Sequence, residues 1–362
     1  MLDLKKRIQN LVGPHQPTED DFSFLQPGGN DHLIQFAFLN SSDEYLELGP
    51  WDRYNLLLAE LSAQTEIEFI LDDDSRFATY TNKNEKGGKN VQVVMDLRDD
   101  HLIVIYFFGE SKTCQKTNQK LFEFSAFSPC FLNTSALIQI AGMLESVSLL
   151  QYNFEQQPSM FIEPVVMKGK LTGNLAHQIC FEYARLYEPY FCVEKIAGQT
   201  MEGTQGTISF QDTGVMQVDS SRLSDFLKMA EPVFEILKNR YQNLLENCVI
   251  QWQPNPGQLM LTYSGSPLNL FLATPIDKIA GAVKLFASGQ KKLPLVGSAE
   301  RVSRKLWSIK TSDLNTSEQI ELEISANLIR IFLKEKSAIP LLDGVEHYIR
   351  QHISAELESN SL

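Results

Sequence analysis

The longest helical pattern in the chain runs from Ser220 to Asn247. Apolar residues recur there every three or four positions, which predicts an amphipathic helix with one broad apolar face. Pro232 lies inside the pattern and predicts a bend or a local break. The opposite side mixes charge signs as solvated surfaces do, with Lys228, Glu231, Glu235, Lys238 and Arg240. The apolar face comprises Leu223, Phe226, Leu227, Ala230, Val233, Phe234, Leu237, Tyr241, Leu244 and Leu245.

Stretches with a period of two surround this helix and predict antiparallel strands. Residues 91–97 alternate and residues 102–108 are continuously apolar, so these two stretches are expected to pair at the centre of a first sheet. Further strands are expected at 32–39, 45–48, 67–71, 77–81, 122–126, 208–210, 216–218, 249–253, 258–263, 268–273, 306–310, 320–324 and 328–333. Further helices are expected at 2–12, 51–61, 134–150, 174–187, 274–289 and 340–353.

Helices that bracket antiparallel strands predict an α+β fold, with mainly antiparallel sheets covered by helices in two or three modules of similar size. A chain of 362 residues exceeds the usual size of one core. Residues 151–173 lose periodicity, which predicts a domain boundary. We therefore expect an N-terminal α+β domain at 1–155 and a C-terminal α+β domain at 156–362, with a further division near 274–290 left open.

A content of 43% hydrophobic and 21% charged residues is typical of an ordinary soluble protein. The formal net charge of -13 argues against a surface that binds nucleic acid or anionic membrane throughout, because phosphate neutralisation needs clustered Lys and Arg. No secretory signal is recognised, and residues 131–150 are too polar for a membrane span. The five cysteines form no Cys-x-x-Cys pair and fit core thiols, so a cytoplasmic location is expected.

No sequence motif indicates catalysis, cofactor binding or metal binding, and we predict no residues for these roles. The run Asp72-Asp73-Asp74 at a strand end is interpreted as a solvated turn, because the residues after it break the spacing of a calcium loop. A deep pocket that gathers this run with His32 and His101 would instead indicate an enzyme or ligand-binding protein with an unfamiliar site formed only in three dimensions.

The compositional anomaly is a basic segment at 278–310, in which Glu300 is the only acidic residue. Such asymmetry is typical of a surface that docks an acidic partner or a phosphate group, while a solvated face that balances acids elsewhere is the alternative. Nucleic acid is disfavoured, since only Phe286 and Trp307 supply rings for stacking. The residues predicted to bind a partner are Lys284, Lys291, Lys292, Arg301, Arg304 and Lys305.

The missing motifs, the many antiparallel strands and the aromatic stretch 187–191 favour a non-enzymatic protein-interaction module: an adaptor, an assembly factor or a chaperone-like protein. In fold class alone, this architecture is similar to the small acidic α+β chaperones of bacterial secretion systems. The expected partner is another protein, acidic in character, and a homo-oligomer is left open. The alternative function is the enzyme or ligand-binding protein described above.

Overall fold

The computed structural model describes residues 32–39, 48–72, 76–82, 91–124, 126–156, 165–173, 178, 182, 191–200, 207–219, 223–254, 261–272, 275–276, 278–290, 293–314, 317–353 and 357–359. The chain forms two compact units and passes between them more than once. The predicted boundary after residue 155 stays a prediction. The first unit holds Met1–Leu150, Leu171–His177 and Glu194–Ile236, and the second holds Gln151–Lys170, Gln178–Val193 and Leu237–Leu362.

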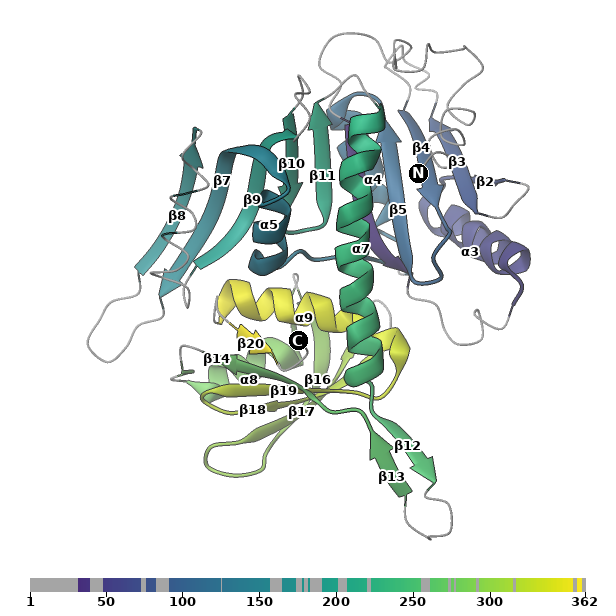
Figure 1. Cartoon of the computed structure of the whole chain (residues 1–362). Helices are drawn as coiled ribbons and strands as arrows, with labels where there is room; N and C mark the ends of the chain where they lie inside the picture. Colours follow the sequence, from purple (N-terminus) through teal and green to yellow (C-terminus); the bar gives the residue numbers. More distant parts are fainter. Residues whose placement is uncertain are drawn as a thin grey trace, which may run out of the picture. The chain divides into compact units, whose positions relative to one another are not determined.

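The larger sheet contains eleven strands in the order β2-β3-β4-β5-β1-β11-β10-β9-β7-β8, with β6 joined to β1 (Figure 1). Every strand pair whose register is described in it is antiparallel, and the predicted pairing of β4 with β5 is confirmed. The strands are β1 (His32–Leu39), β2 (Ile70–Leu71), β3 (Phe77–Asn82), β4 (Val91–Asp96), β5 (Leu102–Phe108), β6 (Phe127–Pro129), β7 (Leu144–Gln156), β8 (Val165–Thr172), β9 (Phe191–Thr200), β10 (Thr207–Gln211) and β11 (Val215–Asp219).

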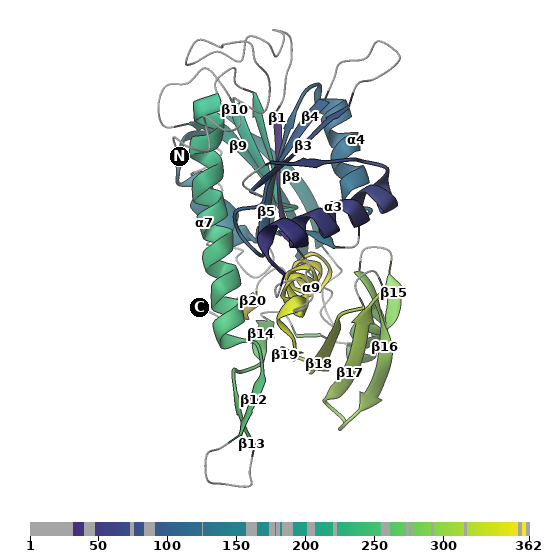
Figure 2. The ribbon, with the colours of Figure 1, turned by 90° about the vertical axis from the view of Figure 1, so that its right-hand side faces the viewer.

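The neighbouring strands β1 and β5 are buried along their whole length. Their continuous apolar runs allow both faces to be covered. On one face, α3 (Pro50–Thr65) and α4 (Ser111–Leu121) pack into a core that includes Leu58 and Phe107. Figure 2 shows these two helices on one side of the sheet and the first half of α7 (Leu223–Asn247) on the other. Helices on an antiparallel sheet make this unit α+β.

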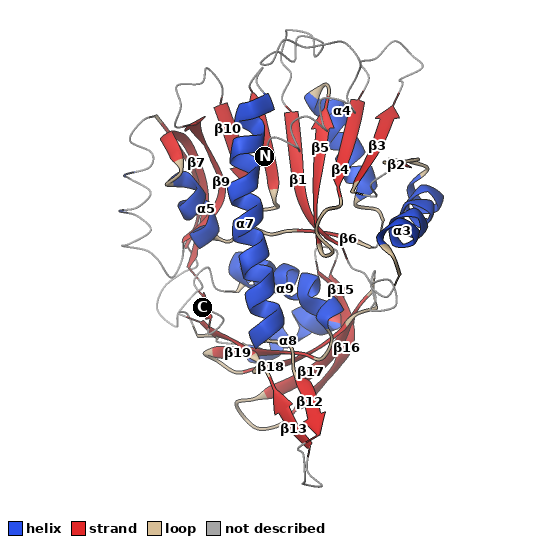
Figure 3. Ribbon diagram, turned by 45° about the vertical axis from the view of Figure 1, so that its right-hand side comes forward, coloured by secondary structure: helices blue, strands red, loops and turns tan. Residues whose placement is uncertain are grey.

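The second unit is also α+β. Its sheet has the order β15-β16-β17-β18-β19-β14-β20, and β12 (Gln251–Pro254) pairs separately with β13 (Leu261–Ser264). Alternate residues of β17, β18 and β19 are buried, and α8 (Ile279–Ala287) and α9 (Ile339–His352) lie on one side of these strands (Figure 3). The short turn η2 (Lys336–Ala338) leads into α9. The strands are β14 (Leu268–Leu272), β15 (Ser288–Gln290), β16 (Leu293–Arg301), β17 (Trp307–Asp313), β18 (Gln319–Ile324), β19 (Leu328–Leu333) and β20 (Leu357–Ser359).

Helix α7 is continuous from Leu223 to Asn247 with Pro232 in its interior. The predicted bend or break at this proline is wrong, because the helix is uninterrupted and its ribbon shows no sharp kink in Figure 1. Burial of the apolar face offsets the one hydrogen bond that a proline nitrogen cannot donate. The described part of the predicted face is confirmed as buried at Ala230, Val233, Leu237, Tyr241 and Leu244.

The helix expected at 134–150 is wrong in its second half, because α5 (Thr134–Ala141) is followed by β7. The Asn133 side chain accepts a hydrogen bond from the Ala136 N–H (2.8 Å) and caps the start of α5, whose C-cap is Gly142. Beyond it, buried residues recur every third position and imitate a helical face, although they belong to a strand. These residues are Leu144, Val147 and Leu150.

The strand expected at 122–126 is also wrong, since residues 122–124 form the turn after α4 and β6 begins at Phe127. The sequence pattern does not predict helix α4, because Cys114 and Thr117 occupy its buried side with Leu121 and give little apolar periodicity.

Within the described part of the chain, no helix is both long and apolar enough to cross a membrane. The helices expected at 2–12 and 174–187 and the strand at 45–48 lie, apart from single residues, outside it.

The turn between β10 and β11 packs against the centre of the larger sheet. Gly214 has a φ of 71°, and its carbonyl oxygen accepts a hydrogen bond from the Phe36 N–H (3.1 Å). A Cβ at this position would lie 2.1 Å from the Cys130 carbonyl oxygen. The Gln35 side chain also binds this turn, because it donates a hydrogen bond to the Thr213 carbonyl oxygen (3.0 Å). Both backbone conformation and packing therefore require glycine at this turn.

Gly214→Ala is expected to lower the free energy of unfolding by at least about 2 kcal/mol, because the methyl group adds a backbone clash to left-handed strain. The matched control is Gly173→Ala in the same unit, where φ is 107° but no described atom lies within 4 Å of the added Cβ. We expect the control to lose about 1 kcal/mol. Urea denaturation followed by circular dichroism measures both, and equal losses would contradict close packing at Gly214.

Candidate functional site

Three of the residues predicted to bind a partner come together where β16 turns into β17. Arg301 ends β16, and Arg304 and Lys305 lie in the loop before β17. All three are exposed. We call the segment 301–306, with its three cations, the basic tip. Sequence reasoning locates these cations but not the strand that carries them, because Pro294 and Gly297 interrupt the strand pattern of 293–301.

Hydrogen bonds within the basic tip fix its shape. The N–H groups of Val302 and Ser303 both donate to the Leu306 carbonyl oxygen at 3.1 Å. The Arg301 guanidinium donates to the carbonyl oxygens of Ser303 (3.2 Å) and Arg304 (3.4 Å). Arg301 therefore supports the loop, whereas the side chains of Arg304 and its neighbour Lys305 form no ion pair with any described residue.

The structure does not bring Lys284 to the basic tip. Lys284 is exposed on α8, and its carbonyl oxygen accepts a hydrogen bond from the Ser288 hydroxyl (2.7 Å). Ser288 is paired with Val296, and the strand path from Val296 to Arg301 is about 17 Å long. Lys284 is thus separated from the basic tip by about half the length of β16. Lys291 and Lys292 lie outside the described residues.

On the outer face of the same sheet, cations form ion pairs with glutamates of the neighbouring strand β18. Glu321 of β18 binds both Lys310 of β17 (3.6 Å) and Lys334 after β19 (2.7 Å). Arg330 binds Glu323 at 3.2 Å. The hydrogen bond from Lys334 is the main cause that lowers the pKa of Glu321. Lys310 belongs to the basic segment by sequence, but its charge is balanced within the fold, unlike the charges of the basic tip.

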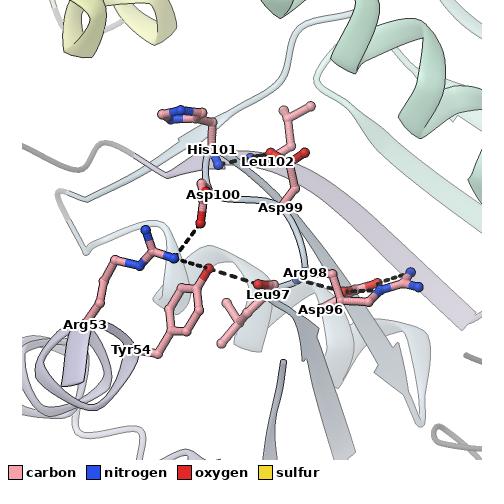
Figure 4. Close-up of polar contacts among 9 residues, drawn as sticks. All are labelled: Arg53, Tyr54, Asp96, Leu97, Arg98, Asp99, Asp100, His101 and Leu102. Carbon is pink, nitrogen blue, oxygen red and sulfur yellow. Dashed lines mark hydrogen bonds and ion pairs between the residues drawn. The ribbon is translucent and has the colours of Figure 1, made fainter. Parts of the chain in front are cut away.

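A second polar cluster joins α3 to the turn between β4 and β5 in the first unit (Figure 4). Arg53 is 6% exposed and forms an ion pair with Asp100. The Tyr54 hydroxyl donates a hydrogen bond to the Leu97 carbonyl oxygen (2.9 Å). Burial is the main cause that raises the pKa of Tyr54, so this phenol stays protonated near neutral pH. These contacts hold α3 on the turn.

Figure 4 also shows Asp96 and Arg98 facing each other on the other side of this turn. The Asp96 carboxylate is buried and accepts hydrogen bonds from Arg98 Nε (2.9 Å) and from a terminal nitrogen of the same guanidinium (2.7 Å). This two-point hydrogen bonding is the main cause that raises the pKa of Arg98. Burial, and then the Asp96 charge, raise the pKa of Tyr106 well above its usual range. The pair is a structural clamp beside a neutral phenol.

Carboxylates in two turns of the first unit bind backbone. The Asp72 carboxylate accepts hydrogen bonds from the N–H groups of Arg76 (2.8 Å) and Phe77 (3.0 Å). Asp99 does the same for the two residues that lead into β5. A carboxylate used in this way stabilises a turn. The other two members of the acidic run, Asp73 and Asp74, lie outside the described residues.

The two candidate histidines lie at opposite ends of β1. His32 is the first residue of β1 and is 6% exposed, with its ring 5.9 Å from that of Phe108. The His101 carbonyl oxygen accepts a hydrogen bond from Leu39, the last residue of β1 (2.8 Å). A strand of this length separates the two by about 23 Å, so one site cannot contain both. Among the described residues, no group of His, Cys, Asp and Glu is arranged to hold a metal ion.

Sequence reasoning misses a buried charge cluster within the second unit. Arg240 of α7 forms ion pairs with Asp343 (2.5 Å) and Glu346 (2.8 Å) of α9, and Arg350 also binds Glu346 (2.8 Å). We call these four residues the buried charge cluster. The pattern along α7 predicts a solvated Arg240, and this is wrong because its partners lie on α9, far along the chain. The only local signal is the spacing of Glu346 and Arg350 by one helical turn.

The charges of this cluster control the ionisation of Glu346. Burial alone would raise the pKa of its carboxyl, but the charges of Arg240 and Arg350 outweigh burial and hold the pKa below its usual range. The nearby Cys248 thiol is affected in the opposite sense, since burial and then the Glu346 charge raise its pKa. The buried charge cluster therefore acts as an ionised clamp between α7 and α9.

Glu346→Gln is expected to destabilise the chain by about 3 kcal/mol at neutral pH, because two arginines lose a buried carboxylate. A lowered pKa in the folded state makes this contribution fully present above the usual glutamate value of 4.5 and removes it as the pH falls through the lower value. The difference in free energy of unfolding between variant and wild type, from urea denaturation, should therefore shrink on acidification.

The control for this variant is Glu323→Gln, which removes the more exposed pair with Arg330 and should change stability by less than about 1 kcal/mol. A difference for Glu346→Gln that stays constant as the pH falls from neutral to below the glutamate value would contradict an ionised, charge-stabilised carboxylate.

Comparison with known proteins gives one similarity. Residues 220–353 are similar to the family described as MJECL33-like protein. The match covers a little over a third of the chain and extends over α7 through α9. It thus includes both the basic tip and the buried charge cluster, but the description names no activity, ligand or partner. No curated protein and no solved structure matches the chain.

Proposed function

We propose that the chain is a non-enzymatic protein-interaction module, such as an adaptor, an assembly factor or a chaperone-like protein, and that the basic tip contacts its partner. The observation that carries this proposal is the contrast in charge pairing within the second unit. Cations on the sheet face and in the buried charge cluster have carboxylate partners, whereas Arg304 and Lys305 have none among the described residues. In a chain of net charge -13, an unbalanced positive site favours an acidic partner.

The polar cluster of the first unit supports this choice over an enzyme. The described carboxylates of this cluster bind an arginine, as Asp96 and Asp100 do, or backbone N–H groups, as Asp99 does. Asp72, in the turn between β2 and β3, also binds backbone N–H groups. A general acid or base needs a carboxylate that faces substrate. Side chains that hold a turn together fit a structural role better.

A protein partner also fits better than nucleic acid. The two rings in the basic segment are poorly placed for stacking, because Phe286 is completely buried and Trp307 is half-buried.

The described free cysteines, Cys114, Cys130 and Cys248, are all buried. Buried free thiols support the cytoplasmic location that we propose.

The test is capture of partners by the tagged, full-length chain from a lysate of its native organism, followed by mass spectrometry. We expect recovery of a stoichiometric acidic protein. The double variant Arg304→Glu, Lys305→Glu should reduce recovery roughly tenfold, because reversed charges repel the acidic surface. The control is Lys112→Glu, Lys116→Glu, which makes the same change in net charge at exposed positions of α4.

Two results would contradict the proposal. The first is failure to recover any stoichiometric protein, together with a small molecule bound to the purified chain, which would favour the alternative function. The second is equal recovery by the two double variants, which would remove the basic tip from the interface.

A further inference from the structure

Strand β16 lies near the edge of the second sheet, between β17 on its inner side and the short strand β15 on its outer side (Figure 2). The pairing with β15 extends from Leu293 to Val296 and contains an irregularity. From Ser298 to Arg301, β16 is paired with β17 on one side, and no described strand lies on the other side. All residues of this stretch are exposed. We call the unpaired side of 298–301 the open edge.

The direction of the backbone groups along the open edge follows from the strand register. The Leu314 N–H donates to the Pro294 carbonyl oxygen (2.9 Å), and the Val302 N–H donates to the Leu306 carbonyl oxygen (3.1 Å). Both bonds continue the same uninterrupted register of β16 with β17. In an antiparallel pair, hydrogen-bonded positions alternate with positions whose N–H and C=O point away from the partner strand. The groups that point to the open edge beyond the pairing with β15 are therefore those of Ala299 and Arg301, because the bridge between Ser288 and Val296 already engages the Gly297 N–H.

The side chains around the open edge combine apolar surface with positive charge. Val296 is 44% exposed and Val302 is 58% exposed, one at each end of the open edge. Leu314 is 63% exposed and lies beside the start of β16, where its N–H bonds to Pro294. Arg304 and Lys305 of the basic tip adjoin the other end. An extended segment along this edge would meet apolar side chains and cations as well as free backbone groups.

Soluble proteins usually protect an edge strand with a proline, a bulge or a covering segment. The proline of β16, Pro294, lies in the part already paired with β15. Between Gly297 and Arg301 there is no proline, and the register with β17 is regular. Within the described part of the chain, the stretch that lacks these devices is also the stretch that adjoins the basic tip. This coincidence is what a binding edge requires.

We infer that the open edge of β16 binds an extended acidic segment of a partner protein as an added β-strand. This inference rests on the proposed function and names its binding mode. The segment exchanges backbone hydrogen bonds with Ala299 and Arg301, and its acidic side chains contact the basic tip. A second copy of β16 would offer the tip a single acid, Glu300, so charge complementarity favours a different, acidic chain.

The test uses the full-length chain and a fluorescent, acetylated peptide of alternating Val and Glu. Ala299→Pro removes one N–H that points to the open edge and leaves the bonds to β17 in place. Ala299→Val keeps that N–H and is the matched control. Fluorescence anisotropy should show binding by the wild type and by Ala299→Val, and roughly tenfold weaker binding by Ala299→Pro. A peptide of alternating Val and Lys should not bind, and unchanged thermal unfolding verifies that both variants fold.

Equal binding of the acidic peptide by Ala299→Pro and Ala299→Val would overturn the added strand, and so would its failure to bind the wild type. If partner capture still depends on Arg304 and Lys305 in either case, the proposed function stands without this binding mode. A dimer in sedimentation experiments that Ala299→Pro dissociates would assign the open edge to a second copy and would also overturn the inference.

Discussion

The pairing of backbone hydrogen-bond groups is the constraint on which this structure depends. Each buried N–H and C=O needs a partner, so a strand inside a sheet must be matched along both of its sides. β1 meets this requirement through β5 on one side and β11 and β6 on the other, and it is buried throughout. Among the described strands, β16 meets it on one side only along 298–301. The proposed interface is therefore one of the places where the described sheets leave pairing incomplete.

The charged side chains of the second unit also divide into those that are paired within the fold and those that are not. The buried charge cluster joins α7 to α9 with carboxylates that are 2% and 6% exposed, and such charges persist only when they are paired. The exposed pairs of β17, β18 and β19 add little stability but leave that face nearly neutral. The basic tip differs from both, because it is solvated and unbalanced. Its cations Arg304 and Lys305 can bind an acidic partner without the loss of an ion pair with any described residue.

Periodicity predicted the parts of the fold in which local pattern and burial agree. The continuous apolar runs of β1 and β5, the apolar face of α7 and the strands β18 and β19 are found where the sequence indicates. Prediction failed where distant pairing decides the structure. Residues 144–150 repeat every third position but form a strand, and Pro232 does not interrupt α7 because the helix is held by its buried face.

The candidate site was predictable only in part, for the same reason. Composition identifies Arg301, Arg304 and Lys305, since a local excess of positive charge needs no three-dimensional information. The strand that presents them was not predicted, and Lys284 is separated from them along β16. The partners of Arg240 lie 106 and 103 residues further along the chain, at Glu346 and Asp343. Contacts of that range leave no periodic signal in a single sequence.

The most direct test of the account is amide hydrogen exchange along β16 in the free, full-length protein. If the edge is open, the amides of Ala299 and Arg301 exchange rapidly, while those of Ser298 and Glu300 are protected by β17. This alternation would establish the unpaired backbone groups on which the proposed interface depends. Uniform protection of all four amides would contradict it, because another part of the chain or a second copy would then already occupy the edge.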